Sequence, residues 1–526
     1  GQTGGVDWGK LSGRSRSFIL SESIEKINLY FYGRNFMYDL QPYLKTIDEV
    51  IARGPYRDTW ESLSTYQVPE WYRNAKFGIF VHWGIFSVPA FGNEWYPRNM
   101  YIQDSPEYEH HIKTYGPHKD FGYKDFIPMF RGERFDPEQW ADLFQKAGAR
   151  YVVPVAEFHD GFQMYQSEIS HWNAYEMGPK RDVLGEISAS CQKRGMALGA
   201  SSHRVEHWFF MGKGKEFDSD VKDPMERGDF YWPAMPGGDP QDIYCKPEPS
   251  EEFMQDWLVR TCELIDKYCP KILWFDWWIQ HSACKPWLKK VAAYYYNRAA
   301  EWDVGVAINY KHDSFLFGTA VPDVERGQFA EIKHYFWQTD TAVALNSWCY
   351  TENNQFRPAP EILCDLVDIV SKNGCLLLNI GPKADGTITE EDRRILLHIG
   401  EWLKDNGEAI YDTKAWRKYG EGPTKVEDGQ FSDGIKKNFT TNDFRFTTAG
   451  SCVYAIALKC SDNGVYDIVS LGEKDASKQA NFHGIIKKVE LLKTGETLEW
   501  SRDEEALHIK CRFKSEDPVA FRISVD

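Results

Sequence analysis

The sequence lacks the marks of several protein classes. It carries 62 Lys and Arg residues against 78 Asp and Glu residues, and its net charge of −16 argues against nucleic-acid binding, which requires a basic surface. The same charge disfavours an anionic membrane surface as a partner. No hydrophobic run reaches transmembrane length, and no signal peptide opens the chain. We therefore expect a cytoplasmic protein of bacterial type, or a secreted or periplasmic one if a signal has been removed. Homo-oligomerisation is left open.

Metal and cofactor motifs are also missing. The eleven cysteines form no C-x-x-C pair and no zinc-finger spacing, so buried free thiols are expected. Neither H-x-H nor H-E-x-x-H occurs, and the segment 212–217 lacks the third glycine of a dinucleotide fingerprint. We expect no metal and no other cofactor, although histidines and carboxylates together could form a zinc site.

Aromatic residues, in contrast, are abundant. The chain has 20 Trp and 28 Tyr, and with Phe they make up 15% of all residues. An aromatic plane matches the apolar C–H face of a pyranose, which favours a carbohydrate-binding protein. Large barrels also bury many aromatic side chains, so composition alone does not decide between these interpretations.

The order of predicted elements indicates a barrel followed by a second domain. A chain of 526 residues exceeds one compact core. Helical segments separate most of eight strand candidates, at 76–84, 151–162, 196–203, 271–280, 304–310, 321–326, 346–350 and 375–382. This alternation predicts an α/β fold, a (β/α)8-like TIM-type barrel over residues 37–410. Short alternating segments over 411–526 predict a C-terminal antiparallel β-sandwich. Residues 1–36 show no periodic pattern of hydrophobic residues, and we interpret them as a loosely ordered or non-native extension.

Polar side chains collect at the ends of these strands. The stretch 271–280, KILWFDWWIQ, carries Asp276 from the end of a buried strand into a group of tryptophans. Strand ends of a barrel meet at one face, where barrel enzymes place their catalytic groups. The same face should receive His82, Glu94, His159, His203 and Glu325.

Three interpretations apply to the histidines: a sugar pocket in which they bind hydroxyl groups, a metal site, or satisfied core residues. The sugar pocket is favoured because Asp276 and Glu325 supply the carboxyl pair that glycoside hydrolysis needs. One carboxylate attacks the anomeric carbon while the other protonates the leaving oxygen. The neighbouring Arg326 would lower the pKa of Glu325 and oppose the acid role unless its side chain points away, as alternation along a strand predicts.

Five ordered motifs carry a resemblance: KFGIFVHWG, NEWYPRNMY, EFHDGF, LWFD and GCLLLNIGPKADGTI. Over about residues 40–526 the chain resembles the α-L-fucosidases of glycoside hydrolase family 29. The resemblance implies a (β/α)8-like domain with a β-sandwich. It also implies a retaining exo-enzyme that removes terminal α-linked L-fucose from fucosylated glycans through a covalent glycosyl-enzyme intermediate, without metal.

The resemblance also implies roles for single residues. Asp276 matches the nucleophile, and Glu325 is the best placement of the acid/base residue, with Glu94 the next candidate. The matching substrate-binding residues are His82, Glu94, Trp95, His159 and Trp274. Two positions depart from the family: Phe158 replaces a second histidine, and His203 stands where others carry a tyrosine. A same-fold glycosidase acting on another sugar such as galactose, and a catalytically silent fucose-binding relative, are the alternatives.

Overall fold

The computed structural model describes residues 31–32, 35–36 and 38–526. The interpretation of residues 1–36 as an extension therefore falls mostly outside the described residues. Within that range, β1 (Phe31–Tyr32) pairs with β2 (Asn35–Phe36) in antiparallel fashion. In the part of the chain that is described, no helix combines the length and the apolar character needed to cross a membrane. Eight of the eleven cysteines are buried free thiols, as predicted.

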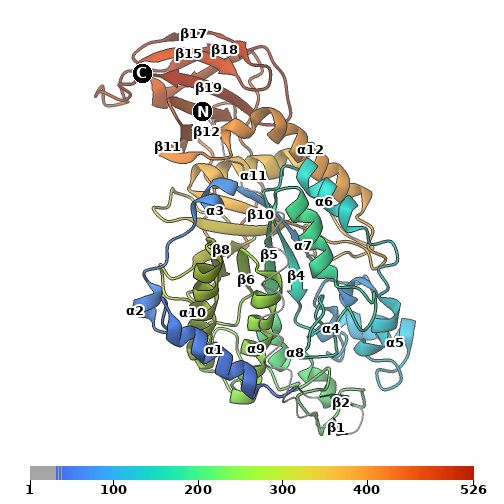
Figure 1. The fold of residues 1–526 in the computed structure, drawn as a ribbon. Coiled ribbons are helices and arrows are strands. Elements are labelled where there is room, and N and C mark those ends of the chain that lie inside the picture. The colour runs from blue at the N-terminus through green and yellow to red at the C-terminus, as the bar shows by residue number, and fades with distance from the viewer. Residues whose placement is uncertain (1–30, 33–34, 37) are drawn as a thin grey trace.

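Eight parallel strands close into a barrel in the order β10-β3-β4-β5-β6-β7-β8-β9, which confirms the predicted fold class (Figure 1). The strands are β3 (Phe77–Val81), β4 (Tyr151–Glu157), β5 (Ala197–Ser202), β6 (Ile272–Phe275), β7 (Ala307–Tyr310), β8 (Val321–Glu325), β9 (Trp337–Ala342) and β10 (Gly374–Ile380). Nearly every residue of these strands is buried, which matches their long apolar runs.

Helices cover the outside of this barrel. The longer ones are α1 (Gln41–Arg53), α6 (Pro137–Lys146), α7 (Val183–Lys193), α9 (Glu251–Tyr268), α10 (Lys285–Trp302), α11 (Ala359–Ser371) and α12 (Glu390–Asn406). The remaining helices are α5 (Pro106–Tyr115), which is as long as α6, and the shorter α2 (Trp60–Leu63), α3 (Glu70–Ala75), α4 (Tyr96–Asn99) and α8 (His207–Phe210). Local sequence sets the ends of α9: the Ser250 hydroxyl accepts from the Phe253 amide at 3.2 Å, and Cys269 ends the helix in a left-handed conformation. Pro270 then turns the chain into β6, the strand that carries Asp276.

The predicted seventh strand is wrong. Residues 346–350 form a loop, and the seventh strand is instead β9, whose sequence is WQTDTA. The polar residues of β9 hide it from a hydrophobic pattern, although all of them are buried, and Gln338 and Asp340 point into the barrel. There the Gln338 amide donates to Asp323 at 2.7 Å, and Asp340 lies 3.2 Å from Lys311. As predicted, no helix separates β8 from β9 within the described residues.

Two antiparallel sheets follow the barrel, as predicted. The larger has the order β11-β12-β13-β19-β15-β16 and the smaller β14-β18-β17. The strands are β11 (Lys414–Glu421), β12 (Phe444–Ala449), β13 (Cys452–Ala457), β14 (Val465–Ile468), β15 (Ile486–Leu491), β16 (Glu496–Thr497), β17 (Glu499–Arg502), β18 (Leu507–Lys510) and β19 (Val519–Val525). The two sheets share a core of their own that includes Phe444, Phe446 and Phe521. The domain boundary at residue 411 stays a prediction.

Candidate active site

Asp276 follows β6 directly and lies between two histidines. Its Oδ2 is 2.9 Å from Nδ1 of His203 and 3.4 Å from Nε2 of His159, while its Oδ1 accepts the amide of Trp277 at 2.7 Å. Burial on its own raises the pKa of Asp276, but the hydrogen bond from His203 and the charge of Lys311 outweigh it, so that the pKa falls below its ordinary value. Asp276 is therefore ionised at neutral pH.

Each histidine beside Asp276 is oriented by a further group. The Nε2 atom of His203 lies 2.9 Å from the Ser201 hydroxyl, so that a neutral ring can accept there and donate from Nδ1 to Asp276. Burial lowers the pKa of His159 to about 3, although Asp276 opposes this shift. His159 is thus neutral, and its Nδ1 lies 3.3 Å from the His203 carbonyl, which can only accept, so that Nδ1 carries the ring hydrogen and donates it there.

Glu206 completes this arrangement behind His159. Its Oε2 lies 3.1 Å from Nδ1 of His159, and its side chain is fully buried. Burial, together with the negative charge of Asp276, raises the pKa of Glu206 well above the ordinary value. The Glu206 carboxyl group therefore lies, in its neutral form, beside the Nδ1–H that donates to the His203 carbonyl, and it closes off that side of the ring. Glu206 stands in the turn after β5, close to the predicted His203, but four residues beyond the strand end.

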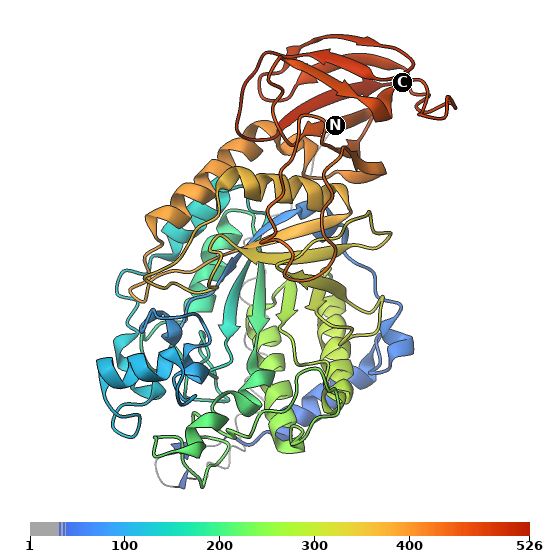
Figure 2. The ribbon, with the colours of Figure 1, turned by 180° about the vertical axis from the view of Figure 1, so that it is seen from behind.

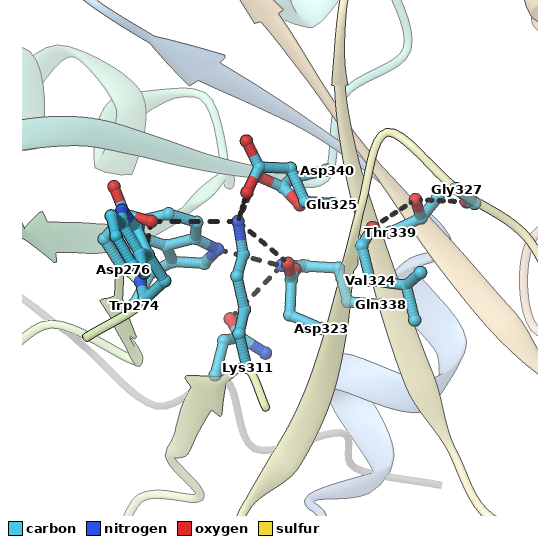
Figure 3. A network of polar contacts seen from close by, with 12 residues as sticks. Trp274, Asp276, Lys311, Asp323, Val324, Glu325, Gly327, Gln338, Thr339 and Asp340 are labelled. Atoms are coloured by element: carbon cyan, nitrogen blue, oxygen red, sulfur yellow. Dashed lines mark hydrogen bonds and ion pairs between the residues drawn. The ribbon is translucent and has the colours of Figure 1, made fainter. Parts of the chain in front are cut away.

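On its other side, Asp276 faces a buried lysine. The Nζ atom of Lys311 lies 3.0 Å from Glu325, 3.2 Å from Asp340, and 3.9 Å from both Asp276 and Asp323 (Figure 3). Only 1% of the Lys311 side chain is exposed. Four carboxyl groups around one buried cation cannot all be ionised, because the cation neutralises only one of them.

The protons distribute unequally over these carboxyl groups. Burial and the adjacent Asp323 raise the pKa of Asp340 well above its ordinary value, so that Asp340 keeps a proton and shares it with Asp323. Burial raises the pKa of Glu325 to about 7; Asp340 and Asp276 act in the same direction, while Lys311 opposes them. Glu325 therefore holds a proton in a sizeable fraction of molecules at neutral pH, next to the ionised Asp276.

Arg326 does not pair with Glu325. Its guanidinium donates to the Ala344 carbonyl at 3.1 Å and lies over the Trp348 ring, 4.6 Å from the centroid. The side chain thus points away, as alternation along the strand predicts. The positive group near Glu325 is Lys311, which follows β7 directly.

The remaining predicted residues form the walls of the site. Nδ1 of His82 donates to Asn379 at 2.7 Å, which leaves Nε2 as an acceptor, and the His82 ring centroid lies 5.5 Å from that of His203. Glu94 accepts the Trp348 amide at 2.9 Å. Trp95 packs on His159, with ring centroids 5.4 Å apart, and Trp274 packs on His203 at 5.1 Å. All eight predicted site residues therefore gather around Asp276.

The comparisons with known proteins agree on one family. A family model described as alpha-L-fucosidase matches residues 44–408, which is more than half of the chain. The chain belongs to the α-L-fucosidase family. Human tissue alpha-L-fucosidase is 31% identical over 430 residues, covering 80% of this chain and 82% of the relative. Human plasma alpha-L-fucosidase is 31% identical over 454 residues, covering 84% and 85%.

A solved structure from the same family agrees with the fold. The alpha-fucosidase of Thermotoga maritima superposes with a TM-score of 0.70 at 30% identity, covering 89% of this chain and 100% of that one. Membership of the α-L-fucosidase family makes the protein a glycoside hydrolase whose substrate class is fucosylated glycans. The resemblance inferred from the five motifs is thereby confirmed.

Phe158, which departs from the family pattern, takes part in packing. Its ring centroid lies 6.0 Å from that of His82 and 5.2 Å from that of His203, so its ring packs against both histidines. The Phe158 side chain has no polar atom, so it cannot bind the sugar hydroxyl group that a second histidine at this position would contact. Glu94, His203 or another wall residue would have to bind that hydroxyl group.

The metal interpretation can now be weighed against the geometry. Among the described residues, His159, His203 and Asp276 offer ligand atoms that all lie within 4.8 Å of one another, so the donor set alone would suit zinc. Lys311, however, already supplies a cation next to Asp276, and His203 contacts the carboxylate directly at 2.9 Å. The contacts favour the sugar-pocket interpretation, in which the histidines are hydrogen-bonding groups.

Sequence reasoning missed Lys311, Asp340 and Glu206. Lys311 follows a correctly predicted strand, so the rule that strand ends carry function would have found it had lysines been included. Asp340 was lost with the wrong seventh strand. Glu206 gives no signal of its own, since only the folded turn brings it to His159.

Proposed function

We propose that this member of the α-L-fucosidase family is a retaining exo-enzyme in which Asp276 is the nucleophile and Glu325 the general acid/base. One observation carries the proposal: around Lys311, the pKa of Asp276 is lowered while that of Glu325 is raised to about 7. A pair of carboxyl groups whose environments drive their pKa values apart is the arrangement by which one acts ionised and the other protonated.

The two steps follow from these protonation states. In the first, a carboxylate oxygen of Asp276 bonds to the anomeric carbon of fucose as the bond to the glycosidic oxygen breaks, and Glu325 gives its proton to that oxygen. In the second, Glu325 takes a proton from water as the water oxygen attacks the anomeric carbon, and the bond to Asp276 breaks. Fucose leaves with its original anomeric configuration.

The spacing of the two groups is compatible with retention. Both contact the same Lys311 ammonium, which places those oxygens no more than about 7 Å apart. This limit includes the about 5–5.5 Å of retaining enzymes and excludes most of the about 6.5–9.5 Å range of inverting ones. During the first step His159 and His203 lose an anionic partner as Asp276 becomes an ester. Since both rings are held by further hydrogen bonds, they stay oriented for the return of the charge.

The substrate is proposed to be a glycan with terminal α-linked L-fucose. The solved structures of the Thermotoga maritima enzyme include one in complex with fucose and one with a mechanism-based inhibitor. In this chain, Trp95 and Trp274 offer aromatic faces, while His82 and Glu94 offer hydrogen-bonding groups for sugar hydroxyls.

The test combines stereochemistry with two variants. Proton NMR of aryl α-L-fucoside hydrolysis should show the α-anomer of fucose first, and first appearance of the β-anomer would overturn retention. Asp276→Ala should lose turnover, whereas Glu325→Ala should keep activity on an activated aryl fucoside and form α-fucosyl azide when azide is added. If the protein hydrolyses an aryl galactoside faster than the aryl fucoside, it is a glycosidase for galactose. If it binds fucose but hydrolyses neither substrate, it is a catalytically silent relative.

A further inference from the structure

One loop of the C-terminal region reaches the barrel beside Glu325. We name residues 428–435 the rim loop; it lies within the long dark orange connection that descends from the C-terminal sheets to the barrel strands (Figure 2). Three of its amides donate to barrel carbonyls at 2.9 Å each: Gly429 to Gln328, Phe431 to Glu325 and Asp433 to Arg326. The rim loop therefore pairs with the backbone of the segment that begins at the proposed acid/base residue.

Side chains anchor the rim loop at both ends. At one end Asp428 accepts the amide of Ala330 at 2.8 Å. At the other end Asp433 accepts the hydroxyl of Thr341, which lies in β9, and its carboxylate is 3.6 Å from the Arg357 guanidinium. These contacts tie the rim loop to β9 as well as to the end of β8.

Gly327 shows how closely the two segments pack. A Cβ atom at this position would lie 2.1 Å from the carbonyl oxygen of Gly429, far inside van der Waals contact. Only glycine fits there while the rim loop is in place. The segment 323–327, which contains the proposed acid/base residue, therefore also contains the contact point for the C-terminal region.

Phe431 is held against this segment by its backbone while its side chain remains in solvent. Its relative exposure is 64%, and its φ of 56° lies in the left-handed region, which side chains other than glycine rarely adopt. An exposed aromatic ring in a costly backbone conformation contributes nothing to the core of the sheets. Its amide nevertheless bonds to the carbonyl of Glu325.

From these contacts we infer that the rim loop forms the subsite for the leaving group, and that Phe431 stacks on the sugar to which fucose is attached. The inference rests on the proposed role of Glu325. A general acid must contact the glycosidic oxygen, so the first sugar of the leaving group lies next to Glu325. The exposed ring of Phe431 belongs to a residue whose amide bonds to the carbonyl of Glu325. Such a ring is suited to stack on the apolar face of that sugar.

The test compares two substrates that need the same protonation but differ in size. Methyl α-L-fucoside has a poor leaving group without a ring, and a fucosyl disaccharide has a poor leaving group with one. The disaccharide is whichever of the α1,2-, α1,3-, α1,4- and α1,6-linked forms the wild-type protein cleaves fastest. Phe431→Ala should lower kcat/KM on the disaccharide about three- to tenfold and leave that on the methyl fucoside unchanged. Phe431→Trp should retain the wild-type preference.

Ile435→Ala is the matched control, since Ile435 is an exposed apolar residue of the same loop whose amide bonds within the loop, to Ser432. It should leave both substrates unaffected. Equal losses on both substrates in Phe431→Ala would mean that Phe431 acts through Glu325 and would overturn the subsite, as would an unchanged disaccharide rate. Failure of the wild-type protein to cleave either substrate would instead contradict the proposed function.

Discussion

Nδ1 of His159 lies 3.1 Å from a carboxyl oxygen of Glu206, and the other nitrogen of the same ring faces Asp276 at 3.4 Å. A buried acid therefore stands behind the imidazole that contacts the proposed nucleophile. Because the pKa of Glu206 is raised by burial, its carboxyl group is neutral where it lies beside the Nδ1–H of His159, and that hydrogen is donated to the His203 carbonyl at 3.3 Å.

Glu206→Ala should therefore lower kcat about tenfold, because the His159 ring loses the group packed beside Nδ1 and with it part of its orientation. Glu206→Gln should keep most of the activity, since the amide has the same size as the carboxyl group and is also uncharged. Steady-state kinetics on an aryl α-L-fucoside measure the effect. Equal losses in the two variants at unchanged melting temperature would show that filling the space beside His159 is not what matters.

The pH dependence of kcat/KM should show a basic limb with an apparent pKa near 7. Glu325 must be protonated to act as the acid, so the rate falls as pH rises through its pKa, which is raised to about 7. Asp276 must be ionised, and its lowered pKa keeps it so across the neutral range. A rate on a disaccharide that stays constant from pH 6 to about 9 would be incompatible with this assignment.

Asp340→Asn should move that basic limb to lower pH. Asp340 and Asp323 share one proton and therefore carry a negative charge beside Lys311, which raises the pKa of Glu325. The neutral amide removes the Asp340 share of that charge, so that the lysine stabilises ionised Glu325 more strongly and lowers its pKa. The matched comparison is Glu138→Gln, a surface carboxyl on α6 that pairs with Lys193 and Arg194 outside the barrel. Only Asp340→Asn should shift the profile, and a shift to higher pH would contradict the argument.

Lys311→Met should lower kcat/KM by about two orders of magnitude. Without the ammonium, the pKa of Asp276 rises, and an acidic limb then moves into the measured pH range because protonated Asp276 cannot attack. The variant also leaves buried carboxyl groups without a cation and should unfold at lower temperature. Lys311→Arg, which keeps the charge, should lose less activity and less thermal stability than Lys311→Met. If Lys311→Arg is equally inactive, the shape of the lysine rather than its charge is required.

Gly327→Ala should disturb the rim loop, whereas Gly434→Ala should not. The added methyl group at 327 would meet the Gly429 carbonyl at 2.1 Å, while a Cβ at 434 has no neighbour within 4 Å. Limited proteolysis should cut the rim loop faster in Gly327→Ala, together with a loss of disaccharide hydrolysis. An intact, fully active Gly327→Ala protein would show that the packing of these segments is not needed.

Much of the barrel and the site could be predicted, because the polar side chains of the site directly follow apolar segments that are recognisable as strands. Asp276 and His159 each follow a buried apolar strand, so the barrel and its catalytic face could be inferred together. The strand β9 could not be inferred, because its buried Gln338 pairs with Asp323 and its buried Asp340 with Lys311 inside the barrel. Such polar pairing has no period along the chain. The contact of Phe431 with Glu325 joins residues more than a hundred positions apart, beyond the reach of any local pattern.

With the rim loop, the proposed site draws its residues from two parts of the fold. The barrel supplies every group that makes or breaks a bond, whereas the surface proposed to meet the departing sugar belongs to the sheets that follow it. Evolution, or a protein engineer, can therefore alter which glycans are trimmed by exchanging a short segment outside the barrel. The chemistry would remain untouched so long as Gly327 still admits the new backbone.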